Sequence, residues 1–351
     1  MGANMNLSRV LPFSAASLLL LAIGCGSSTS TAPPATTIYV VGNGGIQELP
    51  ANGQGNVTPT ATLTPPAGTT ITSLAVDQSG NLYVGAEFDI DTPPTITANY
   101  EVLVYAAGAT GAATPLRTLT IQPNNLSYLY SIAVDATGQI YTVGFDNGAT
   151  NGFNAINVYA PNASGAATPI RQISGAHTYI NNSFLDYSIF LDGAGNIYYD
   201  NDSQWSAISV FPTTATGDVA PARVVIEEYS NLTNYSFPVA VDAAGDIFEL
   251  ANDGWGNYEV LEYAPSTSDQ GGSVGPASNT FSFTCINSMT EGMAVDAAGN
   301  LYIMMNVVVL EAGVPSIQPT VYVFSPGATG NAVPARTMIL SGAYDYLSAV
   351  H

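Results

Sequence analysis

Carboxylates and aromatic rings are the side chains of this sequence that could do chemistry, and they are densest between residues 198 and 205. Asp200 and Asp202 alternate there with Asn201, and such oxygen-bearing side chains are the ligands that a hard cation such as calcium takes. The full calcium-loop pattern D-x-D-x-D-G with a later glutamate is absent. Calcium is therefore the weaker interpretation of this segment, with Asp200, Asp202 and Glu291 as its candidate ligands, and no other cofactor is expected.

Rings beside carboxylates and amides form the amphipathic kind of surface that binds sugars, peptides and cations. On this basis we predict one ligand-binding face, formed by Asp146, Asp200, Asn201, Asp202, Trp205, Glu228, Asp253 and Trp255. The alternative is an acidic face that is solvated and holds no ligand. No catalytic residue is assigned, because His177 and His351 are the only histidines that could act as a base.

The charge of the chain limits its partners. It has 26 acidic residues against 5 basic ones, no lysine, and a net charge of −21. Binding to nucleic acid or to anionic lipid depends on lysine and arginine contacts with phosphates, so both are excluded as expected partners. Cations, amines, neutral polar molecules and proteins remain.

The elements that position these side chains come from an internal repeat. The stretch from Ser131 to Tyr141 is a short apolar strand, an Asp-x-x-Gly turn and a second strand with an aromatic residue, and four similar stretches occur. Its aspartates are Asp77, Asp135, Asp192, Asp242 and Asp296. Aspartate accepts hydrogen bonds from the following amides and glycine supplies a positive φ, so each pair is predicted to close a hairpin. A ring of metal-ligating aspartates is the alternative.

Two further strands complete each repeat. A third strand such as Ile156–Tyr159 is followed by a Gly/Ala/Thr-rich turn, and a fourth begins with a Pro-x-Arg pattern such as Pro169–Arg171. Because proline lacks an amide donor, the fourth strand is expected at the outer edge of its sheet. This pattern contains Arg117, Arg171, Arg223 and Arg336. We predict that these arginines form hydrogen bonds between neighbouring sheets and do not bind a substrate.

The two ends of the chain supply parts of one more repeat. The first repeat begins at its second strand, Ile38–Val40, and Leu347–His351 reads as an opening strand alone. Pairing the two would close a ring and remove its open edges. The sequence therefore predicts an all-β fold over residues 38–351, a six-bladed β-propeller of four-stranded blades whose first blade is closed by the C-terminal strand.

The segment A-V-D-x-x-G-N-L-Y at Ala294–Tyr302 resembles the NHL repeat. The longer unit, with its I-x-V-Y strand and G-A-x-G-x-x-x-P-x-R segment, resembles NHL-like propeller repeats of exported bacterial proteins. The resemblance covers the chain after residue 37 and implies the propeller fold. It implies little about activity, because such propellers include binding scaffolds, lyases and lactonases. Ala61 and Ser278 depart from it at the arginine position, and His351 replaces the turn aspartate.

The first residues indicate export. Residues 1–25 contain an apolar run shorter than the roughly 20 residues that span a bilayer, which is typical of a signal peptide. Ala22–Cys25 resembles a bacterial lipobox, so we predict lipidation of Cys25, with a simple cleaved signal as the alternative. Residues 26–37 form a Ser/Thr/Pro-rich tether. The expected location is outside the cytoplasm, anchored by lipid to the cell envelope.

These features together favour a binding or protein-interaction scaffold that uses its acidic face rich in Tyr, Trp and Asn. The expected partner is a polar or cationic small molecule, a glycan or a protein, and the chain is expected to be a monomer. The alternative is a propeller enzyme, either a lactonase-like hydrolase or a lyase. A central metal is disfavoured because Glu291 is the single acidic residue just ahead of the predicted opening strands. The sequence does not identify the ligand.

Overall fold

The computed structural model describes residues 37–42, 44–50, 52–92, 95–121, 128–145, 154–180, 187–201, 207–226, 238–252, 256–265, 278–285, 288–311, 314–342 and 344–350. Residues Ala35–His351 form one compact unit. Among the described residues, no helix has the length and apolar character needed to cross a membrane.

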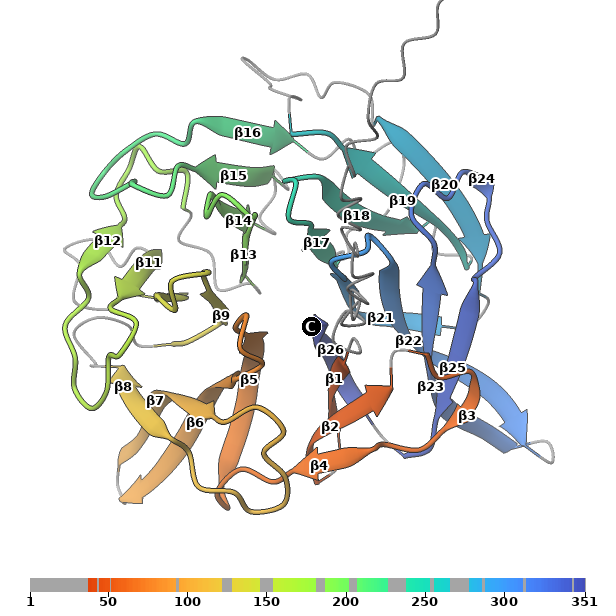
Figure 1. Ribbon diagram of the computed structural model, residues 1–351, viewed down its shortest axis with the longest axis horizontal. Coiled ribbons are helices and arrows are strands. Elements are labelled where there is room, and N and C mark those ends of the chain that lie inside the picture. The colour runs from red at the N-terminus through yellow and green to blue at the C-terminus, as the bar shows by residue number, and fades with distance from the viewer. Residues whose placement is uncertain are drawn as a thin grey trace, which may run out of the picture. The chain divides into compact units, whose positions relative to one another are not determined.

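Six sheets, each with four antiparallel strands, follow one another around a ring, and we number them as blades in chain order (Figure 1). Blade 1 contains β26 (Tyr344–Val350), β1 (Thr37–Gly42), β2 (Gly45–Pro50) and β4 (Ala61–Leu63). Blade 2 contains β5 (Thr69–Val76), β6 (Leu82–Thr92), β7 (Thr95–Tyr105) and β8 (Arg117–Ile121). Blade 3 contains β9 (Ser131–Val134), β10 (Ile140–Phe145), β11 (Asn154–Tyr159) and β12 (Arg171–Ile173).

The second half of the ring repeats this order. Blade 4 contains β13 (Tyr187–Leu191), β14 (Ile197–Asn201), β15 (Ala207–Phe211) and β16 (Arg223–Ile226). Blade 5 contains β17 (Val239–Val241), β18 (Ile247–Asn252), β19 (Asn257–Tyr263) and β20 (Asn279–Thr284), with β24 (Gly330–Asn331) added outside. Blade 6 contains β21 (Ser288–Val295), β22 (Leu301–Glu311), β23 (Val314–Phe324) and β25 (Arg336–Leu340), with β3 (Gly55–Val57) outside. The predicted six-bladed propeller is confirmed.

The ring is closed by the two ends of the chain. Strand β26 pairs antiparallel with β1, with Ile38 opposite Val350 and Val40 opposite Leu347. On the outside, β3 pairs in parallel with β25, which joins the same two ends of the chain a second time. The prediction that the C-terminal strand completes the first blade is therefore confirmed.

Within the described residues, the fourth strands of five blades are covered by the blade that follows, which the sequence did not predict. In blades 1, 2 and 3 the Gly-rich turn of the next blade lies in parallel against the edge, through the bridges Leu63 to Gly111, Leu119 to Gly165 and Ile173 to Gly217. In blades 5 and 6 this contact forms a fifth strand. Glycine makes the approach possible, because Gly165 and Gly217 have φ values of 58° and 72°. The expected outer edge is thus protected from pairing with another chain.

The repeated aspartates close hairpins, as predicted. In blade 3, Asp135 Oδ1 accepts hydrogen bonds from the amides of Thr137 and Gln139 at 2.9 Å each. Its Oδ2 accepts one from the Tyr141 hydroxyl at 3.1 Å. Asp77, Asp192 and Asp296 have the same three partners in their own blades. The carboxylates are therefore occupied by the turns and are not arranged as a ring of metal ligands.

The arginines of the fourth strands join blades through the same tyrosines. Arg171 Nη2 donates to the Tyr141 hydroxyl at 3.1 Å, and Nη1 donates to the carbonyl of Ala215 in blade 4 at 2.9 Å. Arg117 makes the equivalent contact with the Pro161 carbonyl at 2.7 Å. Arg223 donates in the same way to the Pro265 carbonyl of blade 5, so the prediction of hydrogen bonds between blades is confirmed for Arg117, Arg171 and Arg223. Arg336 Nη2 donates to the hydroxyl of Tyr302, which belongs to its own blade. In blade 5 the predicted Ser278 is not at the arginine position: Asn279 lies opposite Glu262 there, and its Nδ2 donates to the Ala328 carbonyl at 3.0 Å.

Substitution of the turn aspartates should show how much their hydrogen bonds to the turn amides and to the tyrosine contribute to stability. Asp135→Ala removes the hydrogen bonds from two amides and the Thr137 hydroxyl and the acceptor of the buried Tyr141 hydroxyl, and we expect it to lower the free energy of unfolding by about 2 kcal/mol or more. Asp242 accepts only the amides of Ala244 and Asp246, because Phe248 has no hydroxyl. Asp242→Ala should therefore cost about 1 kcal/mol. Urea unfolding of both variants measures the difference; equal losses would contradict a role for the tyrosine.

Blades 2 and 6 carry hairpins longer than the sequence predicted. The sequence pattern alone places Glu87, Asp89, Asp91 and Glu311 in loops between second and third strands. They lie instead in β6 and β22, each of 11 residues. The ladders continue until Thr92 pairs with Thr95 and Glu311 pairs with Val314. Alternating and β-branched residues favour extended backbone, which explains why these segments remain strands beyond the ring.

Candidate ligand-binding site

The second strands define two ends of the propeller. They begin at the Asp-x-x-Gly turns, and we name that end the turn face. They finish at Thr92, Phe145, Asn201, Asn252 and Glu311, and we name that end the loop face. Because first strands run antiparallel to second strands, segments that lead into first strands, such as Tyr128–Tyr130, also lie at the loop face. Both kinds of connection therefore emerge at the same end of the propeller.

A tyrosine cluster lies at the loop face between blades 2 and 3. Glu87 and Tyr100 are direct partners across β6 and β7. The Tyr100 ring lies 6.0 Å from that of Tyr128, and Tyr128 is stacked on Tyr130 with centroids 6.2 Å apart and planes 11° apart. Burial and the neighbouring Glu87 carboxylate raise the pKa of Tyr100, so its hydroxyl keeps its proton. We name Glu87, Tyr100, Tyr128 and Tyr130 the tyrosine cluster.

The local sequence explains why the rings of Tyr128 and Tyr130, the two outer rings of the cluster, lie side by side. Leu129, between them, is 2% exposed and packs in the apolar interface of blades 2 and 3. The amide of Tyr130 donates to the Val143 carbonyl at 2.9 Å, which continues the pairing of β9. Tyr128 is 48% exposed. A buried leucine and a ladder hydrogen bond therefore fix the segment, and the cluster combines a carboxylate, a hydroxyl and an accessible ring face.

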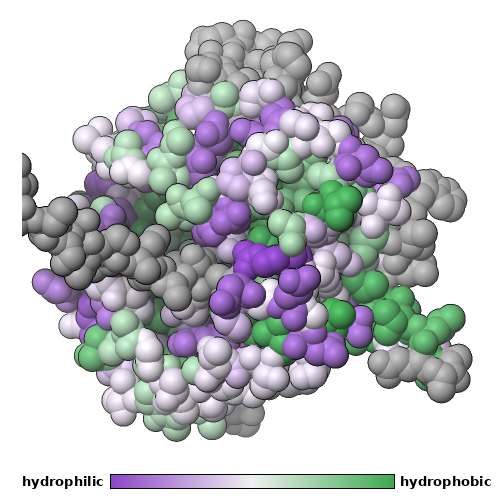
Figure 2. Space-filling view, turned by 45° about the vertical axis from the view of Figure 1, so that its right-hand side comes forward, coloured by the Kyte–Doolittle hydropathy of each residue, from purple (hydrophilic) through white to green (hydrophobic). Residues whose placement is uncertain are grey.

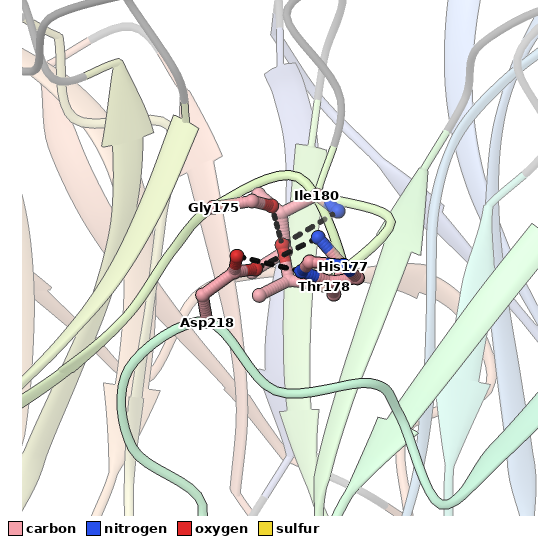
Figure 3. A network of polar contacts seen from close by, with 5 residues as sticks. All are labelled: Gly175, His177, Thr178, Ile180 and Asp218. Atoms are coloured by element: carbon pink, nitrogen blue, oxygen red, sulfur yellow. Dashed lines mark hydrogen bonds and ion pairs between the residues drawn. The ribbon is translucent and has the colours of Figure 1, made fainter.

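A second built loop leads from blade 3 towards blade 4 (Figure 3). The His177 amide donates to Asp218 Oδ1 and the ring Nδ1 lies 2.7 Å from Oδ2, so the loop is fastened to the Gly-rich turn of blade 4. Gly175 has a φ of 128°, and a Cβ there would collide with the carboxyl group of Asp218. Only glycine fits at that position. Thr178 Oγ1 donates to the Gly175 carbonyl at 2.8 Å and accepts from the Ile180 amide at 3.2 Å.

This loop exposes one tyrosine in an unusual conformation. Tyr179 has a φ of 56°, the one positive value at a residue other than glycine in the described part of the chain. It is 65% exposed, whereas its neighbours Thr178 and Ile180 are buried. Backbone strain of this kind is kept where the surroundings enforce it, which is common at functional sites. The His177–Asp218 contact and the buried neighbours supply that enforcement.

The His177–Asp218 pair also has the chemistry of an oriented base. With Asp218 as acceptor, Nδ1 carries the proton and Nε2 is the basic nitrogen of the ring. Hydrogen bonds from the His177 side chain and amide lower the pKa of Asp218. The His177 and Asp218 side chains are 76% and 42% exposed, so water reaches both. The repeat-equivalent residues after the turn glycine are Ala112, Ala166 and Asn331. The acid is therefore specific to blade 4.

Two buried carboxylates face the interface between blades 4 and 5. Glu249 is 2% exposed and lies opposite Val239, and Asp200 is 9% exposed and lies opposite Ile208. Val239 and Ile208 belong to the apolar cluster that joins these blades. Burial raises the pKa of Glu249 to about 7, although the Tyr263 hydroxyl donates to Glu249 Oε2 at 3.1 Å. Neither carboxylate was predicted to be buried.

The structure places few of the predicted site residues. Asp200 and Asn201 end β14, and only the side chain of Asp200 is described. Glu291 Oε1 accepts a hydrogen bond from Asn306 Nδ2 at 2.9 Å. Cys25, Asp146, Asp202, Trp205, Glu228, Asp253 and Trp255 lie outside the described residues. Within the described ranges, no group of three or more His, Cys, Asp or Glu side chains is placed to hold a metal ion.

Comparisons with known proteins add the fold and nothing finer. No family model and no curated protein matches the sequence. A protein of unknown function from Bacteroides caccae is similar in structure, with a TM-score of 0.53 and 8% identity over 89% of this chain and 97% of that one. The GH74 xyloglucanase of Xanthomonas campestris has a TM-score of 0.42 and 14% identity over 87% of this chain and 43% of the xyloglucanase chain. The fold therefore defines a β-propeller.

Proposed function

We propose that this chain is an exported, lipid-anchored β-propeller that binds a neutral or cationic polar ligand, such as a glycan or an amine, at its loop face. The observation that carries the proposal is the tyrosine cluster. Its parallel outer rings offer a stacking surface, and the Glu87 carboxylate beside them accepts hydrogen bonds or attracts a positive charge. Anionic ligands are disfavoured by the net charge of −21.

A propeller suits this role because its loop face is held by rigid strands. Glu87 and Tyr100 lie inside paired strands, and Tyr128 and Tyr130 flank the buried Leu129. Little side-chain and backbone freedom remains to be lost on binding, which favours affinity. Tyr179 is presented in the same way by the next connection between blades. Loops on a rigid scaffold are where ligand sites are usually found.

The proposed anchor is compatible with an accessible loop face. Strand β1 begins at Thr37, and Ile38 lies opposite Leu49 and Val350 at the turn face. A lipid-bearing segment before Thr37 would therefore join the propeller at the turn face. The loop face, with the tyrosine cluster, would then be directed away from the point of attachment. Labelling of cells with a palmitate analogue, lost in Cys25→Ser, tests the anchor.

Substitution of the tyrosine cluster should remove ligand binding. We expect a panel of neutral oligosaccharides, an alkylamine and calcium chloride to include at least one ligand in isothermal titration calorimetry. Tyr128→Ala and Tyr130→Ala should each weaken its binding by about tenfold, because each removes one half of the stacked pair. Tyr128→Phe keeps the ring and should bind nearly as wild type. Leu116→Ala, at a residue 64% exposed just before β8, is the control for surface changes near the turn face.

The same samples separate binding from catalysis. The specific observation in favour of an enzyme is the His177–Asp218 pair, whose Nε2 is available to take a proton. The binding proposal predicts that the bound ligand is recovered unchanged after incubation. Turnover that is abolished in His177→Ala would establish the alternative enzyme. Binding that is unaffected by both alanine substitutions in the tyrosine cluster would contradict the proposed site.

A further inference from the structure

The hairpin of blade 6 extends past the ring as a two-stranded ribbon. Strands β22 and β23 continue to pair from Val307 opposite Gln318 to Glu311 opposite Val314. Strand β21 pairs with β22 as far as Val307, and β25 pairs with β23 as far as Thr320. We name residues 307–311 and 314–318 the ribbon. A two-stranded hairpin is marginally stable in water by itself, so a ribbon of this length needs something to pack against.

One face of the ribbon is apolar and exposed. Cross-strand partners share a face, which places Val308 with Ile317 and Leu310 with Pro315. Val308, Leu310 and Ile317 are 42%, 72% and 65% exposed. Hydrophobic residues gather at the lower right of Figure 2, the side on which this hairpin projects in Figure 1. An exposed contiguous apolar patch marks an interaction site in a soluble protein.

The face, and not the edge, of the ribbon must make the contact. Pro315 and Pro319 lie in β23 and lack amide donors, which disfavours the addition of another strand along this edge. Deep insertion into a bilayer is also disfavoured. The backbone groups at both edges of a two-stranded ribbon would lose water without gaining partners. The partner is therefore a surface that packs flat on Val308, Leu310 and Ile317.

The charge pattern indicates which partner that is. Glu311 is the only charged residue between Asp296 and Arg336, in a chain of net charge −21. Two copies of the chain repel each other over most of their surfaces. They can approach at the ribbon because it carries one charge. The ribbon projects about five residues, or roughly 17 Å, beyond the ring. This distance exceeds the Debye length of about 8 Å at physiological salt, so the charges of the two rings are screened from each other.

We propose that the apolar face of the ribbon packs against the same face of a second copy, which makes the protein a symmetric dimer. A two-fold axis brings Leu310 and Ile317 of one protomer against the same residues of its partner, so a single patch satisfies both copies and no open chain of subunits results. The contact is small, which makes the dimer reversible and dependent on concentration. The monomer expected from the sequence is replaced by this proposal.

Sedimentation velocity of Ala35–His351 tests the dimer. This unit holds all six blades and both closing strands, so we expect it to fold without the residues before it. Over a range from about 1 to about 200 µM, the weight-average mass should rise towards twice the monomer mass. The double variant Leu310→Asn and Ile317→Asn should remain monomeric throughout the range, with an unchanged thermal midpoint.

The matched control replaces two equally exposed residues elsewhere. Leu116 and Ile170 are 64% and 57% exposed at the starts of fourth strands. Leu116→Asn with Ile170→Asn introduces the same chemistry and should leave the mass increase unchanged. A wild-type protein that stays monomeric at every concentration overturns the proposal. A ribbon variant that dimerises as the wild-type protein does also overturns it. The same holds if the wild-type protein binds neutral phosphatidylcholine vesicles and the ribbon variant alone loses this binding.

Discussion

Replacing the buried pair Glu249 and Tyr263 with isoleucine and phenylalanine is expected to raise the free energy of unfolding at pH 8 by about 3 kcal/mol. Burial raises the pKa of Glu249 from 4.5 to about 7 in the folded chain. One pKa unit corresponds to about 1.4 kcal/mol, so holding the carboxylate ionised in the folded state costs about 3 kcal/mol. The double variant carries the residues that blade 6 has at the equivalent positions, Ile303 and Phe324.

The pH dependence follows from proton binding. Between about pH 4.5 and pH 7 the folded chain binds a proton at Glu249 that the unfolded chain has released, so this group lowers stability as pH rises. Below pH 4.5 both states hold the proton and the penalty is absent. The stability difference between the double variant and wild type should therefore be small at pH 4 and reach its full size above pH 7.

Tyr263→Phe alone provides the control for this pair. It removes the hydroxyl that donates to Glu249 Oε2 at 3.1 Å and leaves the carboxylate buried without that donor. We expect this single variant to be less stable than wild type at pH 8 and close to it at pH 4. Urea unfolding at several pH values measures all three proteins. A constant difference between the double variant and wild type from pH 4 to pH 8 would show that Glu249 does not ionise as described.

The fold could be predicted from the sequence because each turn carries its own chemistry. An aspartate with a glycine three residues later closes a hairpin by local hydrogen bonds, as at Asp135 and Gly138, whatever the rest of the chain does. Repetition of that turn fixed the number of blades, and the incomplete first and last repeats fixed the closure. The arginine contacts were predicted for the same reason, since Arg117 and Arg171 recur at one position of the repeat.

Features that depart from the repeat were harder to predict. The period gives no information on how far a hairpin continues, so the acidic residues of β6 and the ribbon were expected in loops. Contacts between distant residues, such as His177 with Asp218, leave no local pattern. The burial of Glu249 is different, because the sequences of the other second strands could have predicted it. Its equivalents in the other second strands are Val40, Val84, Thr142, Tyr199 and Ile303, which identify the position as buried.

In the candidate site, too, the repeat predicts some features and leaves others open. The order of antiparallel strands places every connection into a first strand at the loop face, and Tyr128 and Tyr130 lie in such a connection. Their stacking on each other and on Tyr100 depends on the buried Leu129 and on the length of β7, neither of which the pattern specifies. Strand order thus assigns side chains to a face of the propeller, whereas packing between blades decides which of them meet.

Removal of the closing strand is expected to have the largest effect on stability. Deleting Tyr344–His351 takes away the whole ladder between β26 and β1 and uncovers Ile38 and Val40, which are fully buried. It also removes Tyr344, which is 4% exposed and packs in the apolar cluster of blades 1 and 6. Burial of each large apolar side chain contributes about 1.5 to 3 kcal/mol, so we expect a loss of at least about 5 kcal/mol.

A circular permutant separates the loss of closure from the loss of residues. In blade 2, Val76 lies opposite Leu82 and the two are joined by Asp77–Asn81. In blade 1, Val350 lies opposite Ile38 in the same way, but without a connection. Placing Tyr344–Val350 before Thr37 through an Asp-x-x-Gly turn should therefore give blade 1 the connectivity of the other blades and restore the thermal midpoint that the deletion lowers. If the deletion leaves the thermal midpoint unchanged, β26 does not hold the ring together. If the permutant is soluble but does not recover the wild-type thermal midpoint, closure requires the strand to arrive from the C-terminal end.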